Sequence, residues 1–276
     1  MELFLDNKVA DFLVRCEDFI KANPALNNEI LANCAILSLP NQKLSPVTFI
    51  SCFEGDHCVG AFLKLINLQL NIVANSSIQA ISKVVDVLIE KEISIGRCFG
   101  ACSEEFVQCW QRKIGDNFNL HRTLIAYELS TISDYDDLAG EVRQATLNDL
   151  DIVVNWRKNF LLEVGERYDE KQARVDVLRW ITRKECFLLE DNGRPCSMIN
   201  AFNVGYDLIR IGAVYTPKNL RGRGYSKSLV QQISAFKVAQ GERCILDADL
   251  NNPISNHIYQ KLGYVRVGEL RDYIRL

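Results

Sequence analysis

The sequence predicts an α/β (α+β) fold with mixed sheets, arranged as two domains. Strand-like and helix-like segments mix along the whole chain, which is typical of that class. Near the end of each half the order is strand, helix, strand, and the two helices finish in the triplets Lys113-Ile-Gly115 and Lys261-Leu-Gly263. Glycine at that place is the usual left-handed helix stop. The repetition therefore indicates a duplicated unit.

A polar stretch separates the two halves. Residues 131–141, TISDYDDLAGE, are rich in Ser, Asp and Gly and lie between two periodic regions, as a linker does. A chain of 276 residues is long enough for two domains of ordinary size. We therefore expect one domain at 1–138 and a second at 139–276.

The expected elements follow from periodicity, turn residues and helix stops. In the first half they are a strand at 97–102, a helix at 103–115 and a strand at 120–130. In the second half they are a short strand from 142 and a helix from near Asn148, the strands 185–191 and 195–203 joined by an Asn192-Gly193 turn, the strand 208–216, the helix 226–240 stopped by Gly241, the strand 243–249, the helix 252–264 and the strand 269–276.

Composition excludes several classes of protein. The chain is 48% hydrophobic and 24% charged, as soluble globular proteins are, and its net charge of −3 gives no basic excess for nucleic acid or an anionic membrane. The first residues include Glu2 and Asp6 and lack a basic segment, so we do not expect a secretory signal. No apolar stretch reaches the roughly 18–20 residues of a membrane span. We expect a cytoplasmic protein with no nucleic-acid or membrane partner, and the oligomeric state stays open.

The ten cysteines do not predict a metal or disulfide framework. No C-x-x-C occurs, Cys98 and Cys102 are four residues apart, and His57 adjoins Cys58. Neither arrangement has the spacing of a zinc site. Buried, reduced thiols in a cytosolic protein explain them better than a cysteine- or metal-dependent enzyme, so we expect no metal.

The segment 219–230, NLRGRGYSKSLV, lies where a strand gives way to a helix. Gly222 and Gly224 allow a ligand to approach the backbone, and the first turn of a helix offers free N–H groups and a positive dipole end. Arg221, Arg223 and Lys227 add positive charge. The segment fits a phosphate or pyrophosphate cradle, and an ordinary basic surface loop is the alternative.

A second segment, 247–259, follows the next expected strand. Asp247 and Asp249 share one face of that strand because side chains alternate, and Asn252-Pro253 fits an N-cap followed by proline at the first helical position. We expect buried stripes on both helices, and Tyr259 lies one residue off the second, so its hydroxyl can face a cleft. The expected stripes are Leu229, Val230, Ile233 and Phe236, and then Ile254, Ile258 and Leu262.

Together the two segments resemble the GNAT superfamily of acetyl-CoA-dependent N-acetyltransferases. The phosphate-binding pattern of that family reads here Arg221-Gly-Arg-Gly224-Tyr-Ser226, with serine in the last small position, and the later run Asn252-Pro-x-Ser-Asn-x-Ile-Tyr259 also matches. The resemblance is good from about 142 to 276. It implies tandem GNAT-like domains, each with a mixed, mostly antiparallel sheet flanked by helices.

The resemblance is weak over 1–138. No glycine occurs from 61 to 95, so this half lacks a counterpart of the cradle, and Gln111 stands at the position of Tyr259. By this interpretation the N-terminal half is a degenerate domain without cofactor, serving as a scaffold or as one wall of the substrate cleft.

The resemblance also implies roles for single residues. The pantetheine arm of acetyl-CoA would pair with the backbone of a strand, the pyrophosphate would take N–H groups of the cradle, and two asparagines would lie near the pantetheine. The expected cofactor-binding residues are Val214, Tyr215, Thr216, Arg221, Gly222, Arg223, Gly224, Tyr225, Ser226, Lys227, Asn252 and Asn256.

The expected catalytic residues are a tyrosine and a carboxylate. Tyr259 corresponds to the general acid that protonates the thiolate of coenzyme A, and a backbone N–H near Val214 would polarise the carbonyl. Asp247 is the first candidate for the base and Asp249 the alternative, although either can be structural. His257 is expected at the surface. Four carboxylates near the expected acceptor site either attract a cationic amine or form a solvated helix face: Glu163, Glu166, Asp169 and Glu170.

Two functions are compatible with these residues. The first is an enzyme that transfers the acetyl group of acetyl-CoA directly to a primary amine on a small molecule or peptide. The second is a non-catalytic module that binds an acyl-CoA and regulates a partner. An intact cradle together with Tyr259 favours the enzyme, and the sequence does not identify the amine.

Overall fold

The computed structural model describes residues 1–39, 47–65, 69–133 and 138–276. The chain divides into two compact units that are not consecutive in sequence. The N-terminal unit comprises Met1–Tyr127, Asp247–His257 and Arg266–Leu276, and the C-terminal unit comprises Glu128–Leu246 and Ile258–Val265. Within the described residues, no helix has both the length and the apolar character needed to cross a membrane.

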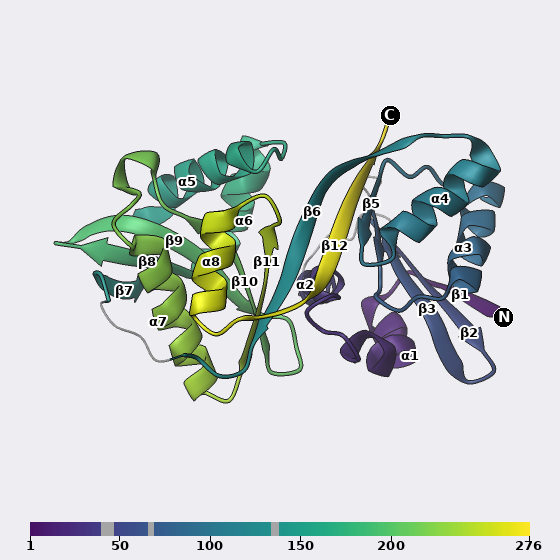
Figure 1. Ribbon diagram of the computed structural model, residues 1–276, viewed down its shortest axis with the longest axis horizontal. Helices are drawn as coiled ribbons and strands as arrows, with labels where there is room; N and C mark the ends of the chain where they lie inside the picture. Colours follow the sequence, from purple (N-terminus) through teal and green to yellow (C-terminus); the bar gives the residue numbers. More distant parts are fainter. Residues whose placement is uncertain (40–46, 66–68, 134–137) are drawn as a thin grey trace. The chain divides into compact units, whose positions relative to one another are not determined.

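Both halves of the sequence follow one order of elements (Figure 1). The first half runs β1 (Glu2–Asp6), α1 (Val9–Lys21), α2 (Asn28–Leu37), β2 (Thr48–Glu54), β3 (His57–Lys64), β4 (Gln69–Ile72), α3 (Ile78–Glu90), β5 (Arg97–Gly100), α4 (Ser103–Ile114) and β6 (Phe118–Leu129). The second half runs β7 (Glu141–Gln144), α5 (Leu150–Glu163), α6 (Glu170–Thr182), β8 (Cys186–Asp191), β9 (Arg194–Asn203), β10 (Leu208–Tyr215), α7 (Tyr225–Ala239), β11 (Arg243–Asp249), α8 (Pro253–Lys261) and β12 (Val265–Arg275). Two short 3-10 helices are added, η1 (Leu147–Asp149) before α5 and η2 (Lys218–Leu220) before α7.

The strands also pair in one pattern in both units. In the N-terminal unit β1 to β4 are successively antiparallel, β4 and β5 are parallel, and β12 closes antiparallel on β5. In the C-terminal unit β7 to β10 are successively antiparallel, and β10 and β11 are parallel. The expected fold class is therefore confirmed, with mostly antiparallel mixed sheets flanked by helices.

Helices cover both faces of the N-terminal sheet. Neighbouring residues of a strand point to opposite sides, and in β2 the neighbours Phe49 and Ile50 are both apolar and buried. Phe49 of β2 packs on Phe12 of α1, with ring centroids 4.9 Å apart. Its neighbour Ile50 belongs to the buried cluster that α3 and α4 complete through residues such as Val84 and Phe106.

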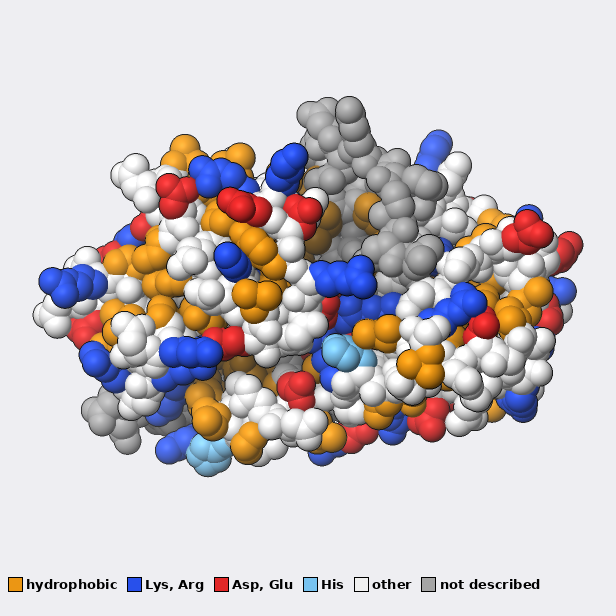
Figure 2. All heavy atoms as spheres, turned by 90° about the horizontal axis from the view of Figure 1, so that it is seen from above, with side chains coloured by type: hydrophobic (Ala, Val, Ile, Leu, Met, Phe, Trp, Pro, Cys, Tyr) orange, Lys and Arg blue, Asp and Glu red, His pale blue; other side chains and the backbone are white. Residues whose placement is uncertain are grey.

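A second buried cluster lies in the C-terminal unit. There α5 and α6 contribute Trp156, Val177 and Trp180, which pack with Met198 of β9 and Tyr215 of β10. Figure 2 looks onto α5 and α6 and shows acidic, basic and apolar side chains next to one another on that surface. Its large exposed apolar side chains include Leu162, Val175 and Leu178.

Several local predictions are confirmed by the backbone. The C-cap of α4 is left-handed Gly115, Gly241 and Gly263 have φ of 82° and 98°, and the Asn192-Gly193 turn has positive φ at both residues. The N-cap of α8 is formed as expected, since Asn252 Oδ1 accepts from Ser255 N at 3.1 Å and Pro253 begins the helix. These features depend on local rules of capping and φ, which the sequence displays directly.

Other local predictions are wrong in detail. The helix expected from near Asn148 starts there as the 3-10 helix η1 and becomes α-helical, as α5, from Leu150. Phe236 is 55% exposed and Ile254 is 73% exposed, so neither belongs to a buried stripe. Helical spacing identifies a face but does not say how far a neighbouring element extends over it.

The expected boundary at 138/139 does not coincide with the division into compact units, because β12 joins the N-terminal unit. Residues 134–137 of the expected linker lie outside the described residues. Next to them, Ser133 N donates to Leu262 O at 3.1 Å within the C-terminal unit. All ten cysteines are free thiols, and eight are buried, whereas Cys58 and Cys102 are partly exposed.

Candidate functional site

The loop before α7 has the backbone that a close ligand requires. Gly222 and Gly224 have φ of +79° and +78°, and a Cβ built on either would meet nothing within 4 Å. A left-handed φ favours glycine, and open space above both residues leaves the backbone accessible. The two glycines are therefore needed for conformation and also leave room for a ligand.

The N-terminus of α7 has no cap of its own. Its N-cap residue is Gly224, no side chain accepts from the first turn, and that turn contains no acidic residue. The first N–H groups of α7 and its positive dipole end thus face the loop, with Lys227 close by in the sequence. An anion is the ligand that such a terminus favours.

The corresponding helix of the N-terminal unit, α3, has a side-chain cap at its N-terminus. The side chain of Ser77, the N-cap of α3, accepts from Ala80 N at 3.1 Å. This internal cap satisfies a backbone donor that is left for a ligand in α7. The two halves share their order of elements but differ at the one helix end that matters for anion binding.

The parallel strand pairs β4–β5 and β10–β11 also differ, in how much of the strand backbone the pairing uses. In the N-terminal unit β4 and β5 stay paired from Gln69↔Arg97 to Ile72↔Gly100, and a Cβ on Gly100 would lie 2.5 Å from Ile72 O. In the C-terminal unit the pairing of β10 with β11 covers only Leu208 to Arg210, although β10 continues to Tyr215. The later part of β10 thus has an edge that this strand pair does not use.

A β-bulge redirects β10 in this later part. The register on β9 changes from Gly212↔Asn200 to Tyr215↔Met198, so Ala213 and Val214 together face one residue. Ala213 takes a φ of +49°, which is uncommon for a residue with a side chain. Bulges re-aim backbone groups and occur often beside functional sites. Sequence reasoning missed this bulge, for which Gly212 was the only available signal.

The three strand residues expected to bind the cofactor are not equivalent. Tyr215 O accepts from Ser197 Oγ at 2.9 Å, and Thr216 O accepts from Arg221 Nε at 2.9 Å. Val214 lies in the bulge and has no partner in the β9 register. Its backbone is therefore the best placed of the three to meet a ligand.

Arg221 braces the loop. Besides its bond to Thr216 O, it donates from Nη2 to Glu163 Oε2 at 2.6 Å, and its guanidinium lies 5.6 Å from the centre of the Tyr215 ring. The side chain thus ties the end of β10 and the end of α5 to the cradle. Two of its nitrogens, Nε and Nη2, already donate to protein partners, and a phosphate role for this side chain stays a prediction.

Tyr225 anchors the start of α7 in the unit. It is buried, and its hydroxyl donates to Asp191 Oδ2 at 2.5 Å. This hydrogen bond, together with burial, raises the pKa of Tyr225. Only the backbone of Tyr225 is therefore offered to a ligand, whereas Arg223 is exposed and the side chains of Ser226 and Lys227 are partly exposed.

Tyr259 lies in the C-terminal unit, as the cradle does. It is 8% exposed, and its ring contacts that of Tyr264 edge-on with centroids 5.8 Å apart. Tyr259 thus belongs to the buried side of α8, where the expected stripe placed Ile254, and His257 is exposed as expected. The acid role of Tyr259 stays a prediction.

The remaining expected site residues lie in the N-terminal unit, where each has a structural contact. Asp247 Oδ1 accepts from the fully buried Asn28 at 2.7 Å, and Asp249 Oδ1 accepts from Asn251 N at 2.7 Å. The Nδ2 atom of Asn256 donates at 2.8 Å to the carbonyl oxygens of Asp249 and Asn252, and its Oδ1 accepts from the Tyr127 hydroxyl at 3.0 Å. The side chain of Asn256 has therefore filled most of its hydrogen-bonding capacity.

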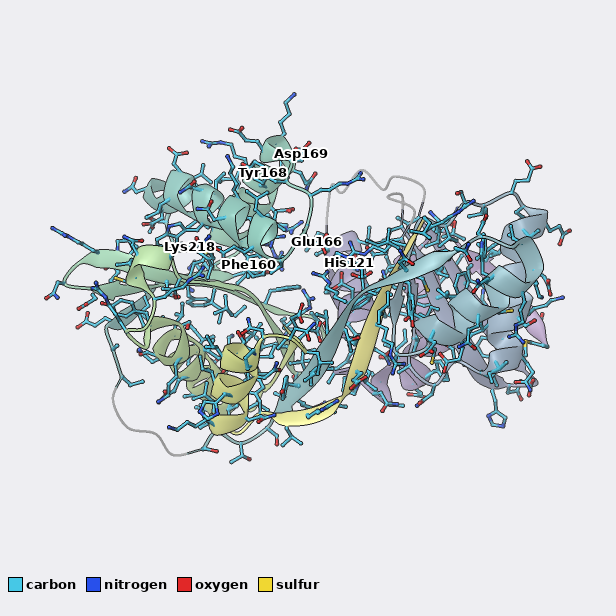
Figure 3. The ribbon with its side chains drawn as sticks, turned by 45° about the horizontal axis from the view of Figure 1, so that its top comes forward. His121, Phe160, Glu166, Tyr168, Asp169 and Lys218 are labelled. Carbon is cyan, nitrogen blue, oxygen red and sulfur yellow. The ribbon has the colours of Figure 1, made fainter. Side chains whose placement is uncertain are left out.

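The four expected acceptor-site carboxylates have separate roles. Glu163 ends α5 and contacts Arg221, and Asp169 caps α6 by accepting from Gln172 N at 2.8 Å. Figure 3 shows Glu166, Tyr168 and Asp169 on the connection between α5 and α6, with Phe160 and Lys218 labelled on the same unit. Glu170 is exposed. The described residues contain no group of three or more His, Cys, Asp or Glu side chains able to hold a metal ion.

Comparison with known proteins agrees with this geometry. Residues 151–264, which contain β10, the cradle and Tyr259, match the model of the acetyltransferase (GNAT) family. These residues therefore carry a GNAT acetyltransferase domain. No curated protein matches the chain in sequence.

The GNAT fold extends beyond the matched residues. A GNAT-family acetyltransferase from Colwellia psychrerythraea superposes with a TM-score of 0.62 at 13% identity, covering 100% of both chains. A GCN5-related N-acetyltransferase from Sphaerobacter thermophilus gives 0.63 at 11% identity, covering 98% of this chain and 94% of its own. At such low identity these structures show the fold alone, and they show it over both halves.

Proposed function

We propose that the protein is an N-acetyltransferase that moves the acetyl group of acetyl-CoA to a primary amine of a small molecule or peptide. The observation that carries the proposal is the start of α7, an uncapped helix N-terminus behind two left-handed glycines with open space above them. The match of residues 151–264 to the GNAT acetyltransferase family supports acyl transfer as the reaction class.

The residues present fit acetyl-CoA. The N–H groups from Gly222 to Lys227 would hold the pyrophosphate, with Arg223 and Lys227 adding charge. The bulged backbone at Val214 would meet the pantetheine end and direct an N–H at the acetyl carbonyl. Acetyl-CoA supplies an acetyl group activated as a thioester.

Protein side chains would then handle the protons. An amine with a pKa of about 10 must be neutral to attack, so a carboxylate, Asp247 or Asp249, would take its proton directly or through water. The nitrogen–carbon bond forms as the carbon–sulfur bond breaks, and Tyr259 would give its phenolic proton to the sulfur. The hydrogen bonds of Asp247 to Asn28 and of Asp249 to Asn251 leave the choice between the two to experiment.

We propose that the N-terminal unit binds no acetyl-CoA. Its parallel strands stay paired to Gly100, and Ser77 caps α3. Both features remove the openings that the C-terminal unit keeps. Its role would then be that of a scaffold.

The deciding experiment is calorimetric titration of acetyl-CoA into the wild-type protein and into Gly224→Glu. We expect one site per chain in the wild type and none in the variant, because the new carboxylate would occupy the cradle and repel the pyrophosphate. Gly205→Glu is the matched control, since Gly205 also has positive φ, at +93°, with nothing within 4 Å, but lies in the turn between β9 and β10.

The outcomes separate the alternatives. Binding in the wild type and in Gly205→Glu, with loss in Gly224→Glu, would support the cradle. Two sites per chain would show that the N-terminal unit also binds. No binding to the wild type would refute the acetyltransferase proposal and leave the loop as a basic turn.

A further inference from the structure

Arg157 of α5 is a partly buried cation that contacts two aromatic rings. Its guanidinium carbon lies 5.1 Å from the centre of the Trp180 ring and 5.6 Å from that of Phe160. Nε is buried and has no partner, and across the described residues Arg157 forms no hydrogen bond or ion pair. A guanidinium has five N–H donors, so this is an unusual state for a half-buried arginine. Such a side chain is available for an anionic ligand.

A second guanidinium lies on the strand that α5 covers. Arg210 of β10 places Nη1 3.9 Å from the position that a Cβ on Gly212 would occupy, and no other atom lies within 4 Å of that position. The space above Gly212 is therefore open, apart from the end of the Arg210 side chain. The missing side chain of Gly212 creates this space.

The charged side chains around Arg157 do not neutralise its positive charge. Burial lowers the pKa of Arg157, and the nearby charges of Arg210 and Arg179 lower it further, whereas Asp176 and Glu166 raise it. Asp176 already pairs with Arg179 at 3.3 Å. The arginines outnumber the carboxylates here, as an anion site requires.

The location relates this site to the reaction. Gly212 directly precedes the bulge at Ala213 and Val214, the part of β10 that would direct an N–H at the acetyl carbonyl. Two residues along a strand span about 6–7 Å. An acceptor that reaches from Val214 to the space above Gly212 is thus a small molecule with a few carbons between its two polar groups.

We propose that Arg157 and Arg210 receive a carboxylate of the acceptor, so that the acceptor is an amine carrying a carboxylate a few carbons from its amino group. The planar fork of an arginine matches a carboxylate through two parallel hydrogen bonds. The inference rests on the proposed function, because it places the carboxylate relative to the acetyl group.

The test compares carboxylate acceptors with neutral analogues. β-Alanine and 4-aminobutyrate are each assayed with acetyl-CoA beside the corresponding carboxamide, using the wild type, Arg157→Gln and Arg157→Lys. We expect the wild type to prefer at least one acid over its amide by tenfold or more in kcat/KM. In Arg157→Gln the KM for that acid should rise at least tenfold with kcat changed less than threefold, and Arg157→Lys should recover part of the loss.

Arg174→Gln is the matched control. It removes one positive charge from α6 at an exposed side chain that pairs with Asp151. It should leave the KM for the preferred acid and the KM for its amide unchanged. A second readout needs no turnover: the chemical shift or melting temperature of the protein with CoA is followed as the preferred acid or its amide is added. Arg157→Gln should lose the response to the acid while its affinity for acetyl-CoA stays at the wild-type value.

Contrary results are distinguishable from failure of the proposed function. If acetyl-CoA does not bind, the proposed function fails, and the acid titration of the protein alone still tests the anion site. If acetyl-CoA binds but acids and amides are used equally, or Arg157→Gln behaves as the wild type does, the carboxylate site is wrong. Both Arg157 variants could also lose activity on acids and on amides equally and melt at a lower temperature. That result would overturn the carboxylate site, because Arg157 would then have a structural role.

Discussion

Arg221 and Glu163 join the cradle to the end of α5 through a hydrogen bond of 2.6 Å between Nη2 and Oε2. The same guanidinium donates to Thr216 O, so one side chain links the strand, the helix and the loop. The arginine of the phosphate-binding pattern thus acts first on the shape of the loop. Positioning of the backbone N–H groups then depends on a carboxylate outside the motif.

This link predicts that Glu163→Ala weakens acetyl-CoA binding, although Glu163 acts through Arg221 and not by contact with the ligand. Both side chains are partly exposed, so the pair itself adds at most about 1 kcal/mol to stability. We expect the Kd to rise about three- to tenfold and the melting temperature to change little. Titration calorimetry measures the first and scanning fluorimetry the second. Asp151→Ala, which breaks another surface pair in this unit, is the control. An unchanged Kd in Glu163→Ala would show that the loop keeps its shape without the brace.

Tyr259→Phe tests the acid. The variant keeps the ring that packs on Tyr264 and removes only the hydroxyl. If Tyr259 protonates the leaving sulfur, kcat should fall about 10²–10⁴-fold while the Kd for acetyl-CoA stays within a few-fold. Pre-steady-state assays and calorimetry give the two values. Tyr168→Phe, on the connection between α5 and α6, is the comparison. Full activity in Tyr259→Phe would remove Tyr259 from the mechanism, and no activity even in the wild type would favour the regulatory module.

Asp149 gives a stability prediction with a defined pH range. The bidentate contact of Arg143, at 2.8 and 2.9 Å, and the bonds from Thr146 lower the pKa of Asp149 to about 2. A folded-state pKa below the unfolded value of about 3.9 stabilises the protein above pH 4, and this contribution is lost as pH falls toward 2. Asp149→Asn should therefore cost about 1–2 kcal/mol at pH 7 and progressively less at acidic pH.

Urea unfolding at several pH values measures this difference. The difference in the free energy of unfolding between the wild type and Asp149→Asn should be constant from pH 7 to 5. This gap should narrow below pH 4. A gap that stays constant down to pH 2 would mean that the carboxylate charge is not responsible. Asp151→Asn, whose side chain is 87% exposed, should show no gap at any pH.

Asp272 should be essential for the N-terminal unit. Its side chain is fully buried in β12 and pairs with Arg97 Nη2 at 2.5 Å and with Arg122 Nε at 3.1 Å. Asp272→Ala leaves two arginines without their carboxylate, which typically costs about 3–5 kcal/mol. Chemical unfolding should show this loss, whereas Glu269→Ala, at a partly exposed pair in the same strand, should cost less than about 1 kcal/mol. A similar small loss in both variants would show that β12 is held by backbone pairing alone.

Features that obey local rules could be predicted from the order of residues alone. Left-handed helix ends need glycine, so Gly115, Gly241 and Gly263 marked where helices stop. The Asn252-Pro253 pair marked where α8 begins, and the glycines of the cradle marked an accessible backbone before α7. Each of these depends on the φ angle or the N–H groups of a few consecutive residues, which composition and order already restrict.

Features that depend on partners distant in sequence could not be predicted and became known from the folded chain. The bulge at Ala213 exists because β10 gains a residue relative to β9, and the opening beside it exists because β11 stops pairing after Ile245. The hydrogen bond from Tyr127 to Asn256 depends on residues far apart in sequence, and so does the lack of a partner for Arg157 Nε among the described residues. No local pattern encodes such pairings, because each depends on which surfaces the folded chain brings into contact.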